Sequence, residues 1–331
     1  MSITIKEIAT IAGCSATTVS KVLNGREMGI SESTKAKILS IADEHHYVPN
    51  MMAKTLRGQK TYTIGFMLPD ITSGYFSKIT RGIEDTARKR GFNVVFYDTD
   101  NMPERVHSAI SFFTSRMVDG IILDQVDFPK DLRFLPRDIP IVITDRLIHG
   151  IEAPGINTGR VYSDTLDAIH TITRLHILSG SNKIAYIASK PITPFDRYYG
   201  YAAALKEADI EINEDLLYWG RYEIETGAKG IEHFISNGID FDSVICSHDL
   251  IAVGAMDALK SHGISIPEKV RISGVGDIAF VRYLTPSLTT VSQFSYDMGE
   301  VAANMLIDNI VDGKPLSQKK IEYEIIRRES L

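Results

Sequence analysis

Residues 4–25 read TIKEIATIAGCSATTVSKVLNG, and this stretch decides the fold of the N-terminal part of the chain. Apolar residues recur at helical spacing over residues 5–12, and Gly13 favours a tight turn before a second helix over residues 15–23. Ala9, Gly13 and Val19 have the spacing of a helix-turn-helix: a small residue where the helices touch, a glycine at the turn, and a β-branched residue that holds the second helix. An ordinary helical hairpin with no DNA role is the alternative.

The charge of the chain changes sign between its two parts. Residues 1–60 hold eight Lys/Arg and five Asp/Glu, a balance of +3, and the other 271 residues hold 28 and 37, a balance of −9. A basic head on an acidic body favours a nucleic-acid partner for the head. The positions expected to be exposed on the second helix are short or cationic and can enter a major groove. They are Ser15, Ala16, Thr17, Ser20 and Lys21.

Two further helices are expected in this head. A third helix begins at a cap around Ser31 and continues to about His46. After a break at residues 47–50, Asn50 can cap one more short helix over residues 51–57, which Gly58 ends. So few residues do not hold a helix in water, so we expect a partner to supply its order.

From Thr61 onward, apolar β-rich runs alternate with amphipathic helical patterns, which indicates parallel β-α-β units. Some ten strands are too many for one small lobe, so we expect two lobes with a cleft between them. The predicted strands are residues 63–68, 93–97, 120–123, 141–144, 183–188, 216–219, 243–246, 270–274 and 288–291.

Polar residues gather just past the carboxyl ends of these strands, where ligands of open parallel sheets bind. An Asp at such a position can simply cap the next helix, but several carboxylates with an Arg suit a polyhydroxyl ligand, whose hydroxyls need donors and acceptors. These residues are Asp70, Asp124, Asp145, Arg197, Tyr222, His248, Asp249 and Asp277.

The head resembles the headpiece of the lac repressor family over about 58 continuous residues. The resemblance rests on residues 4–25, on SESTKAKIL at 31–39 and on YVPNMMAKTLRG at 47–58. It implies base reading by Ala16, Thr17 and Lys21, where Lys21 replaces the usual Arg and lacks its two-pronged fork. It also implies a minor-groove wedge at Leu56. The further DNA-binding residues expected are Thr4, Ser15, Thr18, Ser20, Asn24, Asn50 and Ala53.

The body is similar to the periplasmic-binding-protein-like sensor domain of the same family. The similarity rests on IGFMLPDITSGYF at 64–76, VDGIIL at 118–123, RYYGY at 197–201, VICSHDLIAVGAM at 244–256 and YLTPSLTTVSQ at 283–293. It implies an effector cleft lined by Ser73, Tyr75, Asp124, Asp145, Arg197, Tyr222, His248, Asp277 and Gln293, with Phe294 as a further candidate.

Three positions in the body depart from the family pattern. His248 stands where many members have Asn, and Gly276 replaces the first of two acids, which leaves only Asp277. Arg160, in the segment expected to cross between the lobes, could favour an acidic or phosphorylated ligand. The departures leave both a sugar and a sugar phosphate open as the effector.

Other classes of protein lack support in the sequence. Cys14 and Cys246 are too far apart to suggest a disulfide framework or a zinc site, and no phosphate-binding or nucleophile motif is present. We therefore expect no enzyme activity, no cofactor and no metal. The absence of a signal-peptide pattern and of a long apolar run favours the cytoplasm.

Taken together, the sequence predicts a two-part repressor: a helical headpiece, residues 1–58 with a hinge helix at about 50–58, and a two-lobed α/β domain, residues 59–331. The first lobe is expected at about 61–158 plus 292–320, and the second at about 159–291 plus 321–331. The expected partners are a palindromic double-stranded operator, a sugar or sugar-phosphate effector and a second copy of the chain. A solute-binding protein or an enzyme of sugar metabolism with the same two-lobed body is the alternative.

Overall fold

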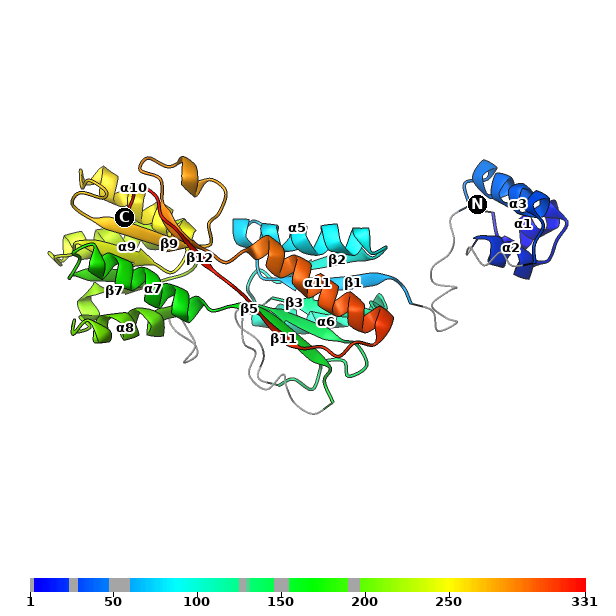
Figure 1. The fold of residues 1–331 in the computed structure, drawn as a ribbon, viewed down its shortest axis with the longest axis horizontal. Helices are drawn as coiled ribbons and strands as arrows, with labels where there is room; N and C mark the ends of the chain where they lie inside the picture. Colours follow the sequence, from blue (N-terminus) through cyan, green and yellow to red (C-terminus); the bar gives the residue numbers. More distant parts are fainter. Residues whose placement is uncertain are drawn as a thin grey trace. The chain divides into compact units, whose positions relative to one another are not determined.

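The computed structural model describes residues 3–23, 29–47, 60–124, 129, 131–145, 155–189 and 197–331. It divides into two compact units, Met1–Thr61 and Tyr62–Leu331 (Figure 1). The expected hinge helix, with Asn50, Ala53 and Leu56, and the predicted DNA contact Asn24 lie outside the described residues.

The first unit is a small helical domain built on local signals. Its helices are α1 (Ile5–Ala12), α2 (Ala16–Leu23) and α3 (Glu32–Glu44). Thr4 and Glu7 form a reciprocal capping box at the start of α1, and Gly13 ends that helix in the left-handed conformation, with φ of 72°. Ile8, Val19 and Ile38, one from each helix, are fully buried at the centre of the core. Val19 therefore has the packing role that the helix-turn-helix spacing predicts.

The second unit contains two six-stranded sheets, each the centre of one lobe. The first sheet, in the order β11-β5-β4-β3-β1-β2, is parallel throughout. Its strands are β1 (Thr63–Leu68), β2 (Asn93–Asp98), β3 (Gly120–Leu123), β4 (Ile141–Thr144), β5 (Thr158–Ser163) and β11 (Gln318–Ile321).

Helices cover both faces of the first sheet. Successive side chains of its strands point to opposite faces, so apolar residues on both faces pack against helices. Phe66 of β1 packs on one face with α5 (Gly74–Lys89) and α11 (Ser295–Asp312), which lie side by side (Figure 1). Met67, the next residue, packs on the other face with α6 (Pro103–Ser115).

The second sheet has the order β12-β10-β9-β8-β6-β7, and only the pairing of β12 with β10 is antiparallel. Its strands are β6 (Ile184–Ala188), β7 (Leu217–Trp219), β8 (Ser243–Cys246), β9 (Arg271–Val275), β10 (Thr289–Ser292) and β12 (Glu324–Ile326). Its helices are α7 (Thr165–Leu178), α8 (Arg197–Glu207), α9 (Ile224–Ser236) and α10 (Asp249–Ser261), with short turns η1 (Glu214–Leu216) and η2 (Val281–Tyr283). The predicted class, a helical headpiece plus a two-lobed parallel α/β domain, is confirmed.

The chain crosses between the lobes after β5, after β10 and after β11. The first crossing comes later than expected, because the strand Thr158–Ser163 pairs with β4 and belongs to the first lobe. Its side chains alternate between buried and half-buried instead of forming an apolar run, so hydrophobicity gives no sign of this strand in the sequence. Among the described residues, no helix combines the length and apolar character that crossing a bilayer requires.

Candidate functional site

A cavity of about 730 Å³ lies between the two lobes at the carboxyl ends of their strands. Its lining comes from the first lobe, from the second lobe and from the second crossing. The first lobe contributes Pro69, Asp70, Thr72, Ser73, Tyr75, Phe76, Asp100, Asn101, Met102 and Asp145. The other lining residues are Ser189, Arg197, Gly220, Arg221, Tyr222, Glu223, His248 and Leu250 of the second lobe, and Gln293 at the crossing.

A chain of hydrogen bonds crosses the base of this cavity. Arg197, buried at the start of α8, donates from Nη1 to the carbonyl oxygen of Ser247 and from Nη2 to Oε1 of Gln293 at 3.2 Å. Nε2 of Gln293 donates to Oδ1 of Asp145 at 3.3 Å. Since a guanidinium only donates and a carboxylate only accepts, the two neighbours define the orientation of the Gln293 amide. Donors and acceptors from both lobes therefore meet at the base of the cavity.

Aromatic rings from both lobes supply apolar surface to the same cavity. The rings of His248 and Tyr222 form a T-shaped contact, with centroids 5.8 Å apart. Nδ1 of His248 accepts the Leu250 N–H at 3.3 Å and so caps α10, and the Tyr222 hydroxyl accepts from Ser189 Oγ at 2.8 Å. Tyr75 of α5 is buried on the first-lobe side. Flat apolar surface beside paired donors and acceptors suits a polyhydroxyl ring compound.

Seven of the predicted effector residues line the cavity: Ser73, Tyr75, Asp145, Arg197, Tyr222, His248 and Gln293. Asp124 does not line it. Its side chain is buried below the surface and accepts a hydrogen bond from Thr144 Oγ1 at 2.8 Å. Phe294 is also outside the lining. It precedes α11 and has a left-handed backbone conformation.

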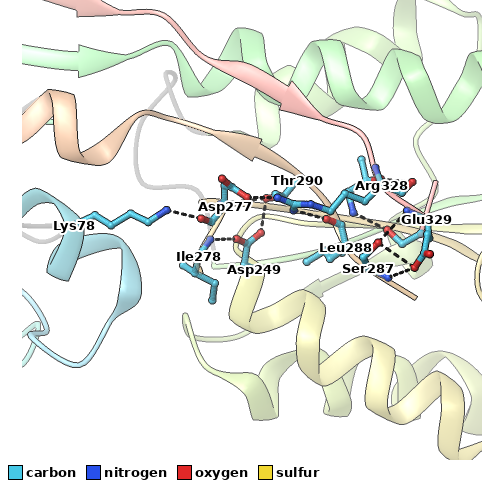
Figure 2. A network of polar contacts seen from close by, with 11 residues as sticks. Lys78, Asp249, Asp277, Ile278, Ser287, Leu288, Thr290, Arg328 and Glu329 are labelled. Carbon is cyan, nitrogen blue, oxygen red and sulfur yellow. Dashed lines mark hydrogen bonds and ion pairs between the residues drawn. The ribbon is translucent and has the colours of Figure 1, made fainter. Parts of the chain in front are cut away.

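Asp277 is the other predicted effector residue that the structure places outside the cavity lining. Its carboxylate accepts from Arg328 Nη2 at 2.6 Å, within the polar network of Figure 2. The neighbouring departure, Gly276, has a φ of 129°, a conformation that residues with a side chain rarely adopt. An acid at position 276 would be strained in this loop.

Arg160 also lies outside the cavity lining. Its Nη2 donates to the main-chain oxygen of Asp145 at 2.9 Å, and its guanidinium stacks over the Tyr162 ring at 4.1 Å from the centroid. The guanidinium of Arg160 is therefore engaged by the Asp145 carbonyl and the Tyr162 ring. The expectation that it faces a ligand is not supported.

The structure adds rim residues that the sequence reasoning missed. Asp100 and Asn101 follow β2, both with a positive φ, and Arg221 and Glu223 follow β7. The rule that ligands bind past strand ends applies to both positions. All four lie within four residues of the end of a strand.

The exposed face of α2 is the second candidate site. Thr17 and Lys21 are exposed, Ala16 and Ser20 are half-buried, and Val19 and Val22 point into the core. Ser15 Oγ accepts the Thr18 N–H at 3.0 Å, so this pair also begins the helix. Thr4 is engaged in the capping box of α1. A face with short side chains and one cation can approach a groove without obstruction.

Comparisons with known proteins cover the whole chain. Residues 4–50 match the model of bacterial regulatory proteins of the lacI family, and residues 176–331 match a periplasmic binding protein-like domain. The HTH-type transcriptional regulator RegA of Clostridium saccharobutylicum is 34% identical over 335 residues, covering 100% of this chain and 99% of RegA. The HTH-type transcriptional repressor PurR of Vibrio atlanticus (strain LGP32) is 31% identical and covers 99% of this chain and 98% of PurR.

Among solved structures, the lac repressor dimer bound to operator and the anti-inducer ONPF has a TM-score of 0.87. It is 20% identical and covers 100% of this chain and 99% of that chain. At this identity the likeness supports the fold, with the headpiece and the two-lobed body in one chain.

Proposed function

The chain belongs to the lacI family of bacterial regulatory proteins, and we propose that it is a repressor that binds a palindromic operator as a homodimer and a sugar or sugar derivative between its lobes. Relatives along its full length are named as transcriptional regulators and repressors, and it is a ligand-responsive DNA-binding regulator of this kind. Because operator DNA lies in the cytoplasm, the proposed repressor would act there.

The hydrogen-bonded chain Arg197–Gln293–Asp145 is the observation that carries the ligand proposal. A buried sugar hydroxyl must both donate and accept, and these hydrogen-bonded residues present a guanidinium donor and a carboxylate acceptor on either side of the Gln293 amide. Tyr75, Tyr222 and His248 supply surface on which a sugar ring can lie.

Charge favours an uncharged sugar over a sugar phosphate. The cavity lining contains four carboxylates, Asp70, Asp100, Asp145 and Glu223, against the two guanidinium groups of Arg197 and Arg221. Arg160, the residue that suggested an anionic ligand, is engaged elsewhere. A phosphate would therefore meet more negative than positive charge.

The DNA side of the proposal follows the geometry of the headpiece. Two headpieces from a dimer would place α2 in major grooves about one helical turn apart, roughly 34 Å. Ala16, Thr17 and Lys21 would read bases, and Leu56 would act as the minor-groove wedge. Effector binding would then shift the lobes and change the spacing of the two hinge segments, which favours or prevents their helix.

The alternatives are a solute-binding protein and a sugar-metabolism enzyme. Neither explains the basic headpiece or the full-length relatives that are named as regulators. A sugar that changes operator affinity should bind reversibly and remain chemically unchanged. Turnover of that sugar would instead indicate an enzyme. A solute-binding protein would bind the sugar and select no DNA.

The test is a selection of binding sites from random DNA with the full chain, repeated with a panel of sugars and sugar phosphates. We expect a palindromic site whose affinity changes with one of the sugars. In the Arg197→Ala variant that response should weaken at least tenfold, since a charged hydrogen-bond donor is lost, while operator affinity stays the same. Lys206→Ala, at an exposed position on the same helix, is the control. A normal response in Arg197→Ala removes this residue from the site, and a chain that selects no DNA refutes the function.

A further inference from the structure

A lysine of the first lobe contacts the second lobe beside the cavity. Lys78 lies on α5 of the first lobe, and its Nζ donates to the main-chain oxygen of Asp277 in the second lobe at 2.6 Å (Figure 2). Within the described part of the chain, Lys78 forms no ion pair with a carboxylate. The carbonyl of Asp277 is thus the contact that holds this ammonium group.

The Asp277 peptide is held by groups on three sides. Its N–H donates to Thr290 Oγ1 at 3.4 Å, and its carboxylate accepts from Arg328 at 2.6 Å. The next N–H, that of Ile278, donates to Asp249 Oδ2 at 2.9 Å. With φ of 44°, Asp277 also has a backbone conformation that residues with a side chain seldom adopt unless their surroundings enforce it.

The groups that bind the N–H groups of Asp277 and Ile278 and the Asp277 carboxylate belong to the second lobe. Arg328, after β12, also donates from Nη1 to the Leu288 oxygen at 2.8 Å. Asp249, fully buried at the start of α10, accepts from Thr290 Oγ1 of β10. The second lobe therefore presents the carbonyl of Asp277 as a rigid acceptor, and Lys78 is the hydrogen-bond donor that reaches it from the described part of the first lobe (Figure 2).

Lys78 does not line the cavity, but its helix does. Ser73, Tyr75 and Phe76, at the beginning of α5, are lining residues, and Lys78 is about one turn further along. A contact at Lys78 therefore ties the ligand-facing end of α5 to the opposite lobe without touching a ligand.

We propose that Lys78 and the Asp277 carbonyl form a latch that stabilises the arrangement of the lobes seen here and so regulates access to the cavity. An ammonium-to-carbonyl hydrogen bond favours the joined arrangement by about tenfold over an unlatched one. A ligand that contacts both lobes binds the joined arrangement, so the latch raises its apparent affinity by the same factor. This consequence for the ligand rests on the proposed function; the latch itself does not.

The latch can be tested without ligand or DNA by measuring the distance between the lobes. Nitroxide labels would be placed in the full chain at Ser111→Cys of α6 and Lys229→Cys of α9, both exposed positions. Cys14→Ser removes the partly exposed native thiol, and Cys246 is buried. Dilution with unlabelled chain restricts the pulsed electron–electron resonance signal to labels within one chain.

We expect one narrow distance distribution for the parent chain and, in Lys78→Met, an increase of about tenfold in the share of chains at other distances. Lys89→Met, at an exposed position on the same helix, should match the parent. A Lys78→Met distribution identical to that of the parent, or the same change in Lys89→Met, overturns the latch. Either result leaves the operator selection unaffected, so the two proposals can fail separately.

Discussion

His176 shows how burial controls the protonation of one residue. Its ring lies fully buried on α7, bonded through Nδ1 to Ser243 Oγ and through Nε2 to Ser273 Oγ, the latter at 2.8 Å. Burial, with a smaller contribution from the charge of Arg271, lowers its pKa from 6.5 to about 3. The ring therefore stays neutral in the folded chain, with one nitrogen donating and the other accepting.

This pKa predicts a loss of stability in acid. Between pH 6.5 and 3 the unfolded chain binds a proton at His176 that the folded chain does not, so the free energy of unfolding falls as pH drops. Between pH 6.5 and 5 the loss is about 2 kcal/mol. Urea unfolding followed by the fluorescence of Trp219, the only Trp, should show that the free energy of unfolding falls by about 2 kcal/mol more in the parent chain than in His176→Gln over this pH range.

Asp249 makes the comparison with the variant necessary. Burial raises its pKa from 3.8 to about 6, so the folded chain binds this proton more readily and gains stability as pH falls through 6. The two effects oppose each other in the parent chain, and only the difference between parent and His176→Gln isolates the histidine. Equal pH dependence in both chains would contradict a neutral His176.

At the scale of the element, α9 and α10 pack with their backbones in close approach. A Cβ on Gly227 would lie 1.8 Å from the oxygen of Ile251, and a Cβ on Gly254 would lie 1.8 Å from the oxygen of Ile224. Neither oxygen can move without moving its helix. The reciprocal glycines therefore set the distance between the two helices.

Gly254→Ala should lower the free energy of unfolding by about 3 kcal/mol, because the added methyl group forces the helices apart. Urea unfolding observed through Trp219 in the same lobe measures the loss. Lys229→Ala, on the exposed side of α9, should change it by no more than about 0.5 kcal/mol. A Gly254→Ala chain as stable as the parent would mean that the helices separate at little cost.

At the scale of the whole molecule, the two units carry net charges of opposite sign. Residues 1–60 carry +3 and the rest −9, and the boundary of the compact units falls at Thr61. The proposed operator binding therefore depends on cations of the headpiece that neutralise phosphates, while the body repels DNA.

The dissociation constant of the operator complex should accordingly rise steeply with salt, on the order of a thousandfold between about 50 and 200 mM for a dimer with several phosphate contacts. Fluorescence anisotropy of a labelled operator measures this change. Residues 62–331 alone, a compact unit, should not bind the same DNA. Operator affinity that does not depend on salt would be inconsistent with phosphate contacts by the headpiece.

Local signals were enough to predict much of the fold. The turn at Gly13 and the buried strand Gly120–Leu123 each have a signal in neighbouring residues, and each element lies where the sequence indicated it. The short, exposed or half-buried strands Gln318–Ile321 and Glu324–Ile326 were missed, since their order comes from pairing with distant strands. Hydrophobic periodicity carries no signal for such edges.

The sequence by itself determined which side chains stand at the ends of strands, because parallel β-α-β units place those ends at one edge of each sheet. Tertiary structure decided which of them reach the cavity: Asp145 and Arg197 do, whereas Asp277 turns to Arg328. It also decided the meeting of Lys78 with Asp277, 199 residues apart. A side chain takes its direction from partners distant in the chain, and no local pattern encodes them.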